Sequence, residues 1–404
     1  MIRWISAGES HGEALTGIID GVPAGIKITS DDIAYALARR RLGHGRGARQ
    51  KFEQDLVRIL GGVRHGLTIG SPIAIEIGNT EWPKWDVVMS PDPVDPAALL
   101  INAGTGDERE IARNRPLTRP RPGHADFAGM MKFGHDDARP VLERASARET
   151  AMRVALGAVA RAFIEQVAEI SIVAHVVEIG DERAEAGIIP TAEDAKALDE
   201  SPVRTLDSEA ESRFVSAIDR AQSSGDTIGG VVEVIAYGLP VGLGTYTQWD
   251  QRLDSRLAGA LMSIQSAKSV AIGDGLDQVR LPGSQAHDEI TVSEGIHRLS
   301  NRAGGIEGGM SNGEPIRARI GFKPISTVPR ARRTIDLVTG QEAPALHQRS
   351  DACAVVPAAV IAEAMTALVL ADAVTDMFGT GSIERIRESI SSYREAIDAR
   401  VRPQ

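Results

Sequence analysis

The sequence repeats part of itself. The segment GGVRHGLTIGSPIAIEIG at residues 61–78 aligns without a gap on GGIEGGMSNGEPIRARIG at residues 304–321, so the two copies begin 243 positions apart (304 − 61). Upstream of each copy lies a shorter echo, GVPAG at 21–25 and GLPVG at 238–242, and a helical pattern follows each echo. Two echoes in the same order indicate an internal duplication.

The repeat predicts two similar halves within a single domain-like unit, roughly residues 1–200 and 201–380, followed by a C-terminal helix over 381–404. Within each half, stretches such as SPIAIEIG and GGVVEVIAYG are typical of strands, whereas SARETAMRVALGAVARAFIEQV predicts a long core helix with many small residues. Strands and helices do not alternate strictly, which favours an α+β fold with antiparallel sheets over a doubly wound sheet. Residues 79–118 and 179–206 lack periodicity and are predicted to be long loops.

The composition limits the functions open to the chain. With 404 residues, 42% hydrophobic and 25% charged, it is long and apolar enough to fold into a large globular unit. A net charge of -10 argues against nucleic acid as a partner. No apolar run approaches the roughly 20 residues of a membrane helix and no signal peptide is visible, so we expect no membrane partner and a cytoplasmic protein. The lone Cys353 is expected to be a small buried hydrophobe, and no Cys/His spacing suggests a metal site.

Against that acidic background, basic residues gather in one proline-stiffened run. The stretch RPLTRPRPGHADFAG at 115–129 places Arg115, Arg119, Arg121 and His124 within a few positions of each other. Such a local concentration of positive charge stands out in an acidic protein and raises the question of what the run binds.

Two further segments could carry chemistry, and each has a plainer explanation. AGESHG at 7–12 places Ser10 and His11 between small residues that let a ligand reach the imidazole, although a histidine in a turn is often structural. ARRRLGHGRGARQ at 38–50 ends a helical pattern in a glycine-rich loop with several arginines. Such a loop suits a phosphate or a carboxylate, but solvated surface arginines would produce the same pattern.

Two segments precede helical patterns. In RASARET at 144–150, Ser146 and Glu149 have the spacing of a capping box, and the same helix N-terminus beside arginines is a candidate anion site. In HQRSDACAVVPA at 347–358, Arg349 and Asp351 stand close together just before a helical pattern and could carry chemistry. An ordinary ion pair between the two side chains would produce the same pattern.

Taken together, GESHG, RPGHAD, RASARETAMR and RSDACAVVPA resemble the signature segments of the chorismate synthase family, in the family's order. The resemblance runs from residue 5 to about residue 380, and the segment 79–118 is similar to the longer bacterial form of the family. It implies a β-α-β sandwich, with helices layered between two antiparallel sheets from two similar halves.

The resemblance also implies the reaction and its partners. The family converts 5-enolpyruvylshikimate 3-phosphate to chorismate by a trans 1,4-elimination of phosphate that uses reduced FMN without net redox change. It further implies a homotetramer, with NADPH as a reductant of the flavin in some members. A substrate with one phosphate and two carboxylates would explain why an acidic protein concentrates arginines in the run at 115–129.

Site residues follow from the resemblance, position by position. The expected catalytic residues are His11, His124 and Asp351. His11 would protonate the departing phosphate, His124 would stabilise the reduced flavin, and Asp351 would exchange the proton at flavin N5. The expected substrate contacts are Ser10, Arg40, Arg46, Arg49, Arg121 and Arg144, and the expected NADPH contacts are Arg40 and Arg46. The expected flavin contacts are Arg144, Ala145, Ser146, Gln265, Ser266, Gly308, Lys323, Pro324, Ile325, Ser326, Thr327 and Arg349.

Two other functional classes remain open on the residues alone. A non-catalytic module that binds a phosphorylated metabolite or a nucleotide would keep its affinity without His11, His124 or Asp351. An ordinary flavin oxidoreductase would oxidise its substrate during turnover.

Overall fold

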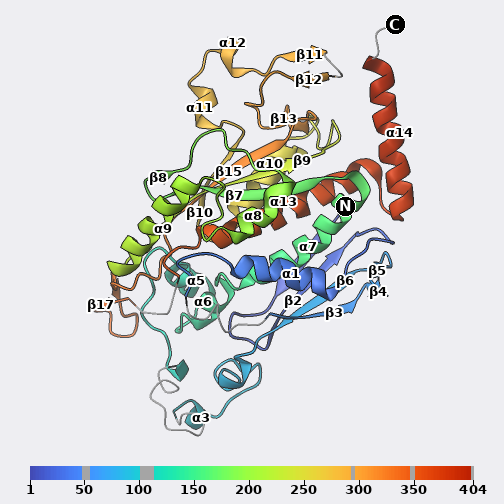
Figure 1. Cartoon of the computed structure of the whole chain (residues 1–404). Coiled ribbons are helices and arrows are strands. Elements are labelled where there is room, and N and C mark those ends of the chain that lie inside the picture. The colour runs from blue at the N-terminus through green and yellow to red at the C-terminus, as the bar shows by residue number, and fades with distance from the viewer. Residues whose placement is uncertain (48–54, 101–112, 293–295, 346–350, 402–404) are drawn as a thin grey trace.

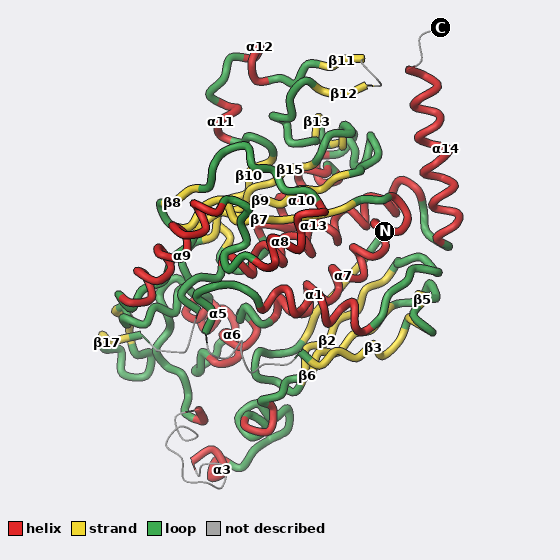
Figure 2. Tube along the Cα trace, in the orientation of Figure 1, coloured by secondary structure: helices red, strands yellow, loops and turns green. Residues whose placement is uncertain are grey.

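The computed structural model describes residues 1–47, 55–100, 113–292, 296–345 and 351–401. Two antiparallel sheets enclose a layer of helices (Figure 1). The same arrangement is visible in Figure 2, where helices lie between two groups of strands. An α+β fold is therefore confirmed, in the layered form that the family resemblance implies.

The first sheet is four-stranded, with the order β1-β2-β6-β3 and antiparallel neighbours throughout. Its inner face is buried because every second residue points to the helices, as Leu15 and Ile19 do in β2. The bounds of its strands are β1 (Arg3–Ala7), β2 (Ala14–Asp20), β6 (Ile73–Gly78) and β3 (Leu56–Gly61).

The second sheet is five-stranded, with the order β10-β15-β9-β7-β8. The outer face of this sheet is partly covered, because Leu198 packs on Val173 and Ile235. The bounds of its strands are β10 (Ala267–Ile272), β15 (Ile316–Phe322), β9 (Gly230–Tyr237), β7 (Ser171–Ile179) and β8 (Glu182–Arg183).

Two long helices form the middle layer. The first, α7 (Glu149–Ala168), contacts β1, β2 and β6, and the second, α13 (Val355–Phe378), contacts β7 and β9. They cross closely at Gly157, where an added Cβ would lie 2.4 Å from the Cβ of Ala364. The prediction that the small-residue helix is a core helix is thus confirmed. The helices α1 (Ser30–Arg41) and α10 (Leu253–Met262) complete the layer.

The expectation that no apolar run approaches membrane length was wrong for α13. Among the described residues it is the one helix long and apolar enough to cross a membrane, with a mean hydropathy of 1.8 over its most apolar window. However, 89% of that window is buried inside the protein. Helix α13 is apolar around most of its circumference because it lies in the middle layer, as expected for a core helix.

The repeated segments form the same small structures. In each copy a two-stranded hairpin precedes a sheet strand: β4 (Val63–Arg64) and β5 (Leu67–Thr68) precede β6, and β13 (Ile306–Glu307) and β14 (Met310–Ser311) precede β15. The order β3-β6-β2-β1 of the first sheet also matches β10-β15-β9-β7 of the second. These matches support the predicted duplication, which stays a prediction.

Shorter elements connect these layers. The segment predicted as a loop at 179–206 contains short elements: the edge strand β8, which pairs with β7, and the helical segments η2 and α8. The predicted C-terminal amphipathic helix is α14 (Ile383–Val401). The remaining elements are η1 (Trp82–Lys84), α3 (Pro96–Leu100), α5 (Asp126–Phe133), α6 (Arg139–Arg144), η2 (Ala192–Asp194), α8 (Ala195–Glu200), α9 (Ser208–Ser223), η3 (Trp249–Gln251), α11 (Leu276–Val279), α12 (Gly283–Ala286), β11 (Ile290–Val292), β12 (Ile296–Arg298), β16 (Arg333–Ile335) and β17 (Glu342–Pro344).

Candidate active site

His11 lies in the turn between β1 and β2, and its ring is held from two sides. Its Nδ1 lies 2.9 Å from Oε1 of Glu143, and its backbone N donates to Oε2 of the same carboxylate at 2.8 Å. The ring also stacks on Trp85, with 3.8 Å between the ring centroids. Glu143 comes from α6 and Trp85 from the segment 79–118, so three distant parts of the chain meet here.

Ser10 and the RASARET segment meet next to His11. The hydroxyl of Ser146 donates to the hydroxyl of Ser10 at 3.1 Å. The guanidinium of Arg144 donates to the backbone oxygens of Gly8 and Ser6, which fastens the end of α6 to the end of β1. The structure therefore brings these three predicted residues together, with Ala145 between Arg144 and Ser146 in the chain.

The alternative explanation of RASARET as a capping box was wrong. Helix α7 begins at Glu149, and its N-cap residue Arg148 makes no side-chain cap. Instead, the Glu149 carboxylate accepts hydrogen bonds from Ser6 at 2.9 Å, Arg153 at 2.8 Å and Gln265 at 3.1 Å. Glu149 thus pairs with Arg153 one turn along the same helix and with two distant residues, Ser6 and Gln265, which brings Gln265 to the start of α7.

The basic run at 115–129 divides into an outer and an inner part. Arg119 is 44% exposed and pairs with Asp336 at 3.1 Å, and Arg115 is also exposed. Arg121 is only 8% exposed and points into the protein, where it donates through Nε to Asp126 at 2.8 Å. Only part of the positive charge therefore faces the interior.

His124 and Arg121 share one buried carboxylate. Asp126 is fully buried, and its Oδ1 lies 2.6 Å from Nδ1 of His124. Burial opposes ionisation of Asp126, yet hydrogen bonds from His124 and Arg121 hold the pKa of this carboxyl well below its ordinary value. The ionised carboxylate orients both side chains in the same way that Glu143 orients His11.

The segment from Lys323 to Thr327 lies against this pair. The Oγ1 of Thr327 accepts from Arg121 at 2.9 Å, and the Lys323 ammonium donates to the backbone oxygen of Gly123. Burial, together with the nearby Lys268, lowers the pKa of Lys323.

The same segment reaches the other predicted flavin contacts. The backbone N of Lys323 donates to the oxygen of Ser266 at 2.9 Å, and Thr227 donates to the oxygen of Ile325 at 2.8 Å. Pro324 and Ser326 lie within the run. Ser266 itself has a φ of 70°, a left-handed backbone that is uncommon for serine.

Asp351 is paired with Arg46. Its Oδ2 accepts from Nη1 of Arg46 at 2.5 Å, and its Oδ1 accepts from the backbone N of Gly47 at 2.6 Å. The glycine-rich loop and the RSDACAVVPA segment therefore meet. Nearby Cys353 is fully buried, as predicted, and burial raises the pKa of its thiol to about 11.

Arg40 lies at the end of α1, beside the start of α7. It is 4% exposed, and its Nη1 lies 3.4 Å from the hydroxyl of Thr150. Arg49 and Arg349 lie outside the described residues. The suggested pair of Arg349 with Asp351 is therefore outside them too.

Gly308 is the predicted contact that the structure does not bring to the others. It lies in the turn between β13 and β14, ahead of Ile316 at the start of β15, whereas Lys323 follows the last residue of β15. Seven residues of strand separate the two ends, roughly 20 Å at about 3.3 Å per residue.

Sequence reasoning missed four residues of this site: Glu143, Glu149, Asp126 and Trp85. Two of them could have been found, because Asp126 stands two positions after His124 and Glu143 stands directly before Arg144. An acid beside a candidate catalytic histidine or arginine is a signal for an orienting partner. No comparable signal marks Trp85.

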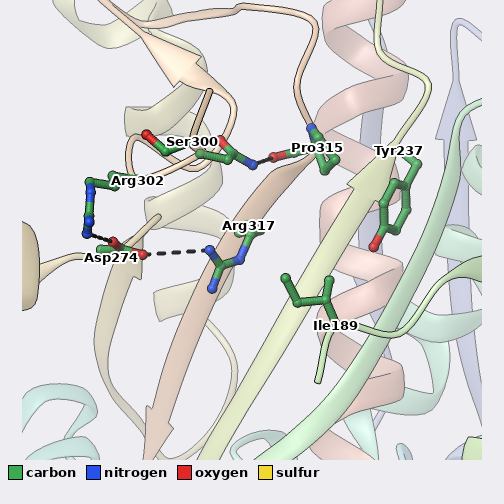
Figure 3. A pocket seen from close by; sticks show the side chains of 8 residues that line it. Ile189, Tyr237, Asp274, Ser300, Arg302, Pro315 and Arg317 are labelled. Atoms are coloured by element: carbon green, nitrogen blue, oxygen red, sulfur yellow. Dashed lines mark hydrogen bonds and ion pairs between the residues drawn. The ribbon is translucent and has the colours of Figure 1, made fainter. Parts of the chain in front are cut away.

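A cavity of about 400 Å³ lies elsewhere, on the outer side of the second sheet (Figure 3). In it Asp274 pairs with Arg302 at 3.1 Å and with Arg317 at 3.6 Å. None of the predicted site residues lines this cavity. The candidate active site is therefore defined by the contacts above and not by this cavity.

Known proteins resemble the whole chain. A family model described as chorismate synthase matches residues 2–375. The chorismate synthase of Streptomyces coelicolor is 58% identical over 400 residues, covering 99% of each chain. That of Mycolicibacterium vanbaalenii is 59% identical over 401 residues, covering 99% of this chain and 97% of its own.

The structural comparison agrees. A crystal structure of chorismate synthase superposes with a TM-score of 0.77 at 35% sequence identity, covering 98% of both chains. The resemblance carried by the four motifs is confirmed over nearly the full length. The chain belongs to the chorismate synthase family, whose members are carbon–oxygen lyases that act on a phosphorylated substrate in aromatic amino-acid biosynthesis.

Proposed function

We propose that the residues gathered around His11, His124 and Asp351 carry out the family's reaction, the trans 1,4-elimination of phosphate from 5-enolpyruvylshikimate 3-phosphate to give chorismate. The main support is that each histidine is held at Nδ1 by a buried carboxylate, Glu143 for His11 and Asp126 for His124. An ionised carboxylate only accepts, so each contact requires a proton on Nδ1 and orients the ring. Such fixed rings suit general acid and base work.

The substrate would be held by the arginines that line the same region. Arg40, Arg46, Arg121 and Arg144 come from different parts of the chain, and Arg49 is proposed with them. Guanidinium groups bind phosphate and carboxylate through paired hydrogen bonds. Ser10 would bind the phosphate, and His11 beside it would protonate that phosphate as it leaves.

Two buried polar atoms fit a flavin. Oε1 of Gln265 and Nε of Arg46 have no hydrogen-bond partner among the described residues. A flavin ring offers both N–H donors and carbonyl acceptors, so it could satisfy such groups. The residues proposed to hold it are Arg144, Ala145, Ser146, Gln265, Ser266, Gly308, Lys323, Pro324, Ile325, Ser326, Thr327 and Arg349.

The family requires a reduced flavin, and we propose FMN. When bound, reduced FMN supplies an electron-rich ring beside the breaking C–O bond. His124 would stabilise the charge of the reduced ring, and Asp351 would hold the proton from C6 near flavin N5. NADPH held by Arg40 and Arg46 is proposed as a reductant, although Arg40 is 4% exposed and Arg46 is already paired with Asp351.

Turnover is expected to depend on the redox state of FMN. Under anaerobic conditions we expect no chorismate with oxidised FMN and full activity after reduction by dithionite, because only the reduced ring is electron-rich. Chorismate and phosphate should form in equal amounts without substrate oxidation. Equal turnover with oxidised FMN would contradict the proposal, and net oxidation would favour an oxidoreductase. A parallel assay with NADPH and oxidised FMN tests whether the protein reduces its own flavin.

A homotetramer in the cytoplasm is proposed with this function. The outer face of the first sheet exposes Ile5 and Ile18, which pair across β1 and β2 and are 67% and 45% exposed. Gly308 lies far from the other proposed flavin contacts within one chain, so a second copy would have to supply it. An exposed apolar sheet face is a common site of self-association. The location is supported by the burial of α13, the membrane-length helix among the described residues.

Charging the sheet face is expected to break up the assembly. Ile18→Lys should lower the molar mass measured by light scattering after size exclusion, because a buried ammonium opposes sheet stacking. Val338→Lys is the matched control, since Val338 is 75% exposed and lies in a distant turn. A monomeric unmutated protein would refute the tetramer, and a tetrameric Ile18→Lys variant would place the interface elsewhere.

A further inference from the structure

The ring of His11 is enclosed by two side chains outside the motif that contains it. Both oxygens of the Glu143 carboxylate lie near Nδ1, at 2.9 and 3.0 Å, and Oε2 also accepts from the His11 backbone. The Glu143 side chain is fully buried and that of His11 is 16% exposed. One carboxylate therefore fixes both the backbone and the ring of this residue.

The opposite constraint comes from Trp85. Its ring stacks on His11 at an interplanar angle of 25°. The guanidinium of Arg113 lies 5.2 Å from the centroid of the Trp85 ring, and that of Arg139 lies 5.8 Å away. These two cation–π contacts help to fix the position of the indole.

The segment that carries Trp85 is itself tied to α6. Arg139, on that helix, donates to the backbone oxygen of Arg113 at 2.6 Å, and Arg113 donates to the oxygen of Lys84 at 2.7 Å. Nη1 of Arg139 also lies 3.9 Å from Oε1 of Glu143. The carboxylate and the indole are therefore parts of one connected arrangement around the imidazole.

We propose that Glu143 and Trp85 are positioning residues for His11, and that placing Trp85 is one role of the segment 79–118. The proposal rests on the proposed catalytic role of His11. Glu143 holds the proton on Nδ1, so the proton that His11 transfers to the departing phosphate is carried by Nε2. Trp85 limits rotation of the ring and so fixes the direction of Nε2. Neither residue touches the reacting atoms in this assignment.

Glu143→Gln tests the carboxylate. We expect kcat to fall by about 10–10³-fold, part of the range for general acid catalysis, while KM and the dissociation constant of reduced FMN stay within about twofold. Glu143→Asp should recover part of the loss, because it restores the charge on a shorter side chain. Two-dimensional ¹H–¹⁵N spectra of the ligand-free chain should show the Nδ1–H form of His11 in the unmutated protein and a mixture of tautomers in Glu143→Gln.

Trp85→Leu tests the stacking. A stacked ring pair contributes modestly, so we expect kcat to fall about 2–10-fold with KM unchanged. Trp82→Leu is the matched control, because Trp82 lies in the same turn and makes no ring contact with His11 among the contacts described. Equal losses in Trp82→Leu and Trp85→Leu would indicate a general disturbance of the segment and overturn the role of Trp85.

The outcomes separate this inference from the function on which it rests. If His11→Ala retains full activity, the catalytic role of His11 fails, whatever the spectra show. If His11→Ala is inactive but Glu143→Gln has normal kcat and an unchanged tautomer, the positioning role of Glu143 is overturned. The proposal would be supported if Glu143→Gln folds and lowers kcat on its own but lowers kcat no further when it is added to His11→Ala. The two changes would then act through one group. Losses that simply add in the double variant would overturn it.

Discussion

Asp351→Asn is expected to lower anaerobic kcat by about 10²–10⁴-fold while reduced FMN and substrate still bind. The change keeps the size of the side chain and removes the group proposed to hold a proton, and loss of acid–base assistance has this magnitude. Asparagine can still accept from the backbone N of Gly47, which now lies 2.6 Å from Oδ1. The measurements are anaerobic kcat, the dissociation constant of reduced FMN and the melting temperature.

The competing explanation is that Asp351 serves only as the counter-charge of Arg46, 2.5 Å away. In that case Asp351→Asn should melt early and bind ligands poorly, yet turn over normally once saturated. Arg46→Ala is the informative comparison, because it breaks the same ion pair and keeps the carboxylate. If Arg46 binds substrate, its loss should weaken substrate binding by about 1.5–3 kcal/mol and leave a larger residual kcat than Asp351→Asn.

The sequence could locate the site because its motifs are contiguous. RPGHAD contains both His124 and the carboxylate that orients it, so the local group could be found from neighbouring letters. Alternating apolar residues are also a local signal, and they predicted the segments of β6 and β9 as strands. Patterns of this kind depend on residues a few positions apart.

Contacts between distant segments could not be predicted in this way. His11 and Glu143 are 132 positions apart, and the pairing of Arg46 with Asp351 spans 305 positions. Glu149 shows the same limit. Its spacing from Ser146 predicted a local cap, but two tertiary donors, Ser6 and Gln265, engage its carboxylate together with Arg153 one turn along α7. These partners replace the local cap because several charged or polar donors stabilise a buried carboxylate more than one exposed backbone cap does.

A charge cluster in the middle layer was also absent from the sequence interpretation. Glu363 on α13 accepts from Arg39 at 2.7 Å, from Arg204 at 2.8 Å and from Arg161 at 3.1 Å. Asp199 provides a second carboxylate to Arg39 and Arg204. Five charges from α1, α7, α8, α13 and the loop after α8 therefore meet in the middle layer, next to the arginine at the end of α1 that is proposed to bind substrate.

Glu363→Gln is expected to lower the free energy of unfolding by about 3–5 kcal/mol, because it leaves buried arginines without their main counter-charge. The change is measured by urea unfolding of both proteins, provided that their unfolding free energies depend on urea concentration with the same slope. Glu388→Gln is the matched control, since Glu388 is exposed on α14. A loss below about 1 kcal/mol would mean that Asp199 and water compensate for the missing charge.

The pH dependence gives the same carboxylate a second, independent test. Burial alone would raise the pKa of Glu363, but Arg39, Arg204 and Arg161 lower it from 4.5 to about 2. Because the unfolded chain binds the proton at the higher pH, the stability that Glu363 contributes is fully present above pH 4.5 and is lost as the pH falls from 4.5 towards 2. The difference in unfolding free energy between the unmutated protein and Glu363→Gln should therefore shrink across that window. A difference that stays constant down to the lowest pH at which both proteins fold would show that the variant acts through packing and not through charge.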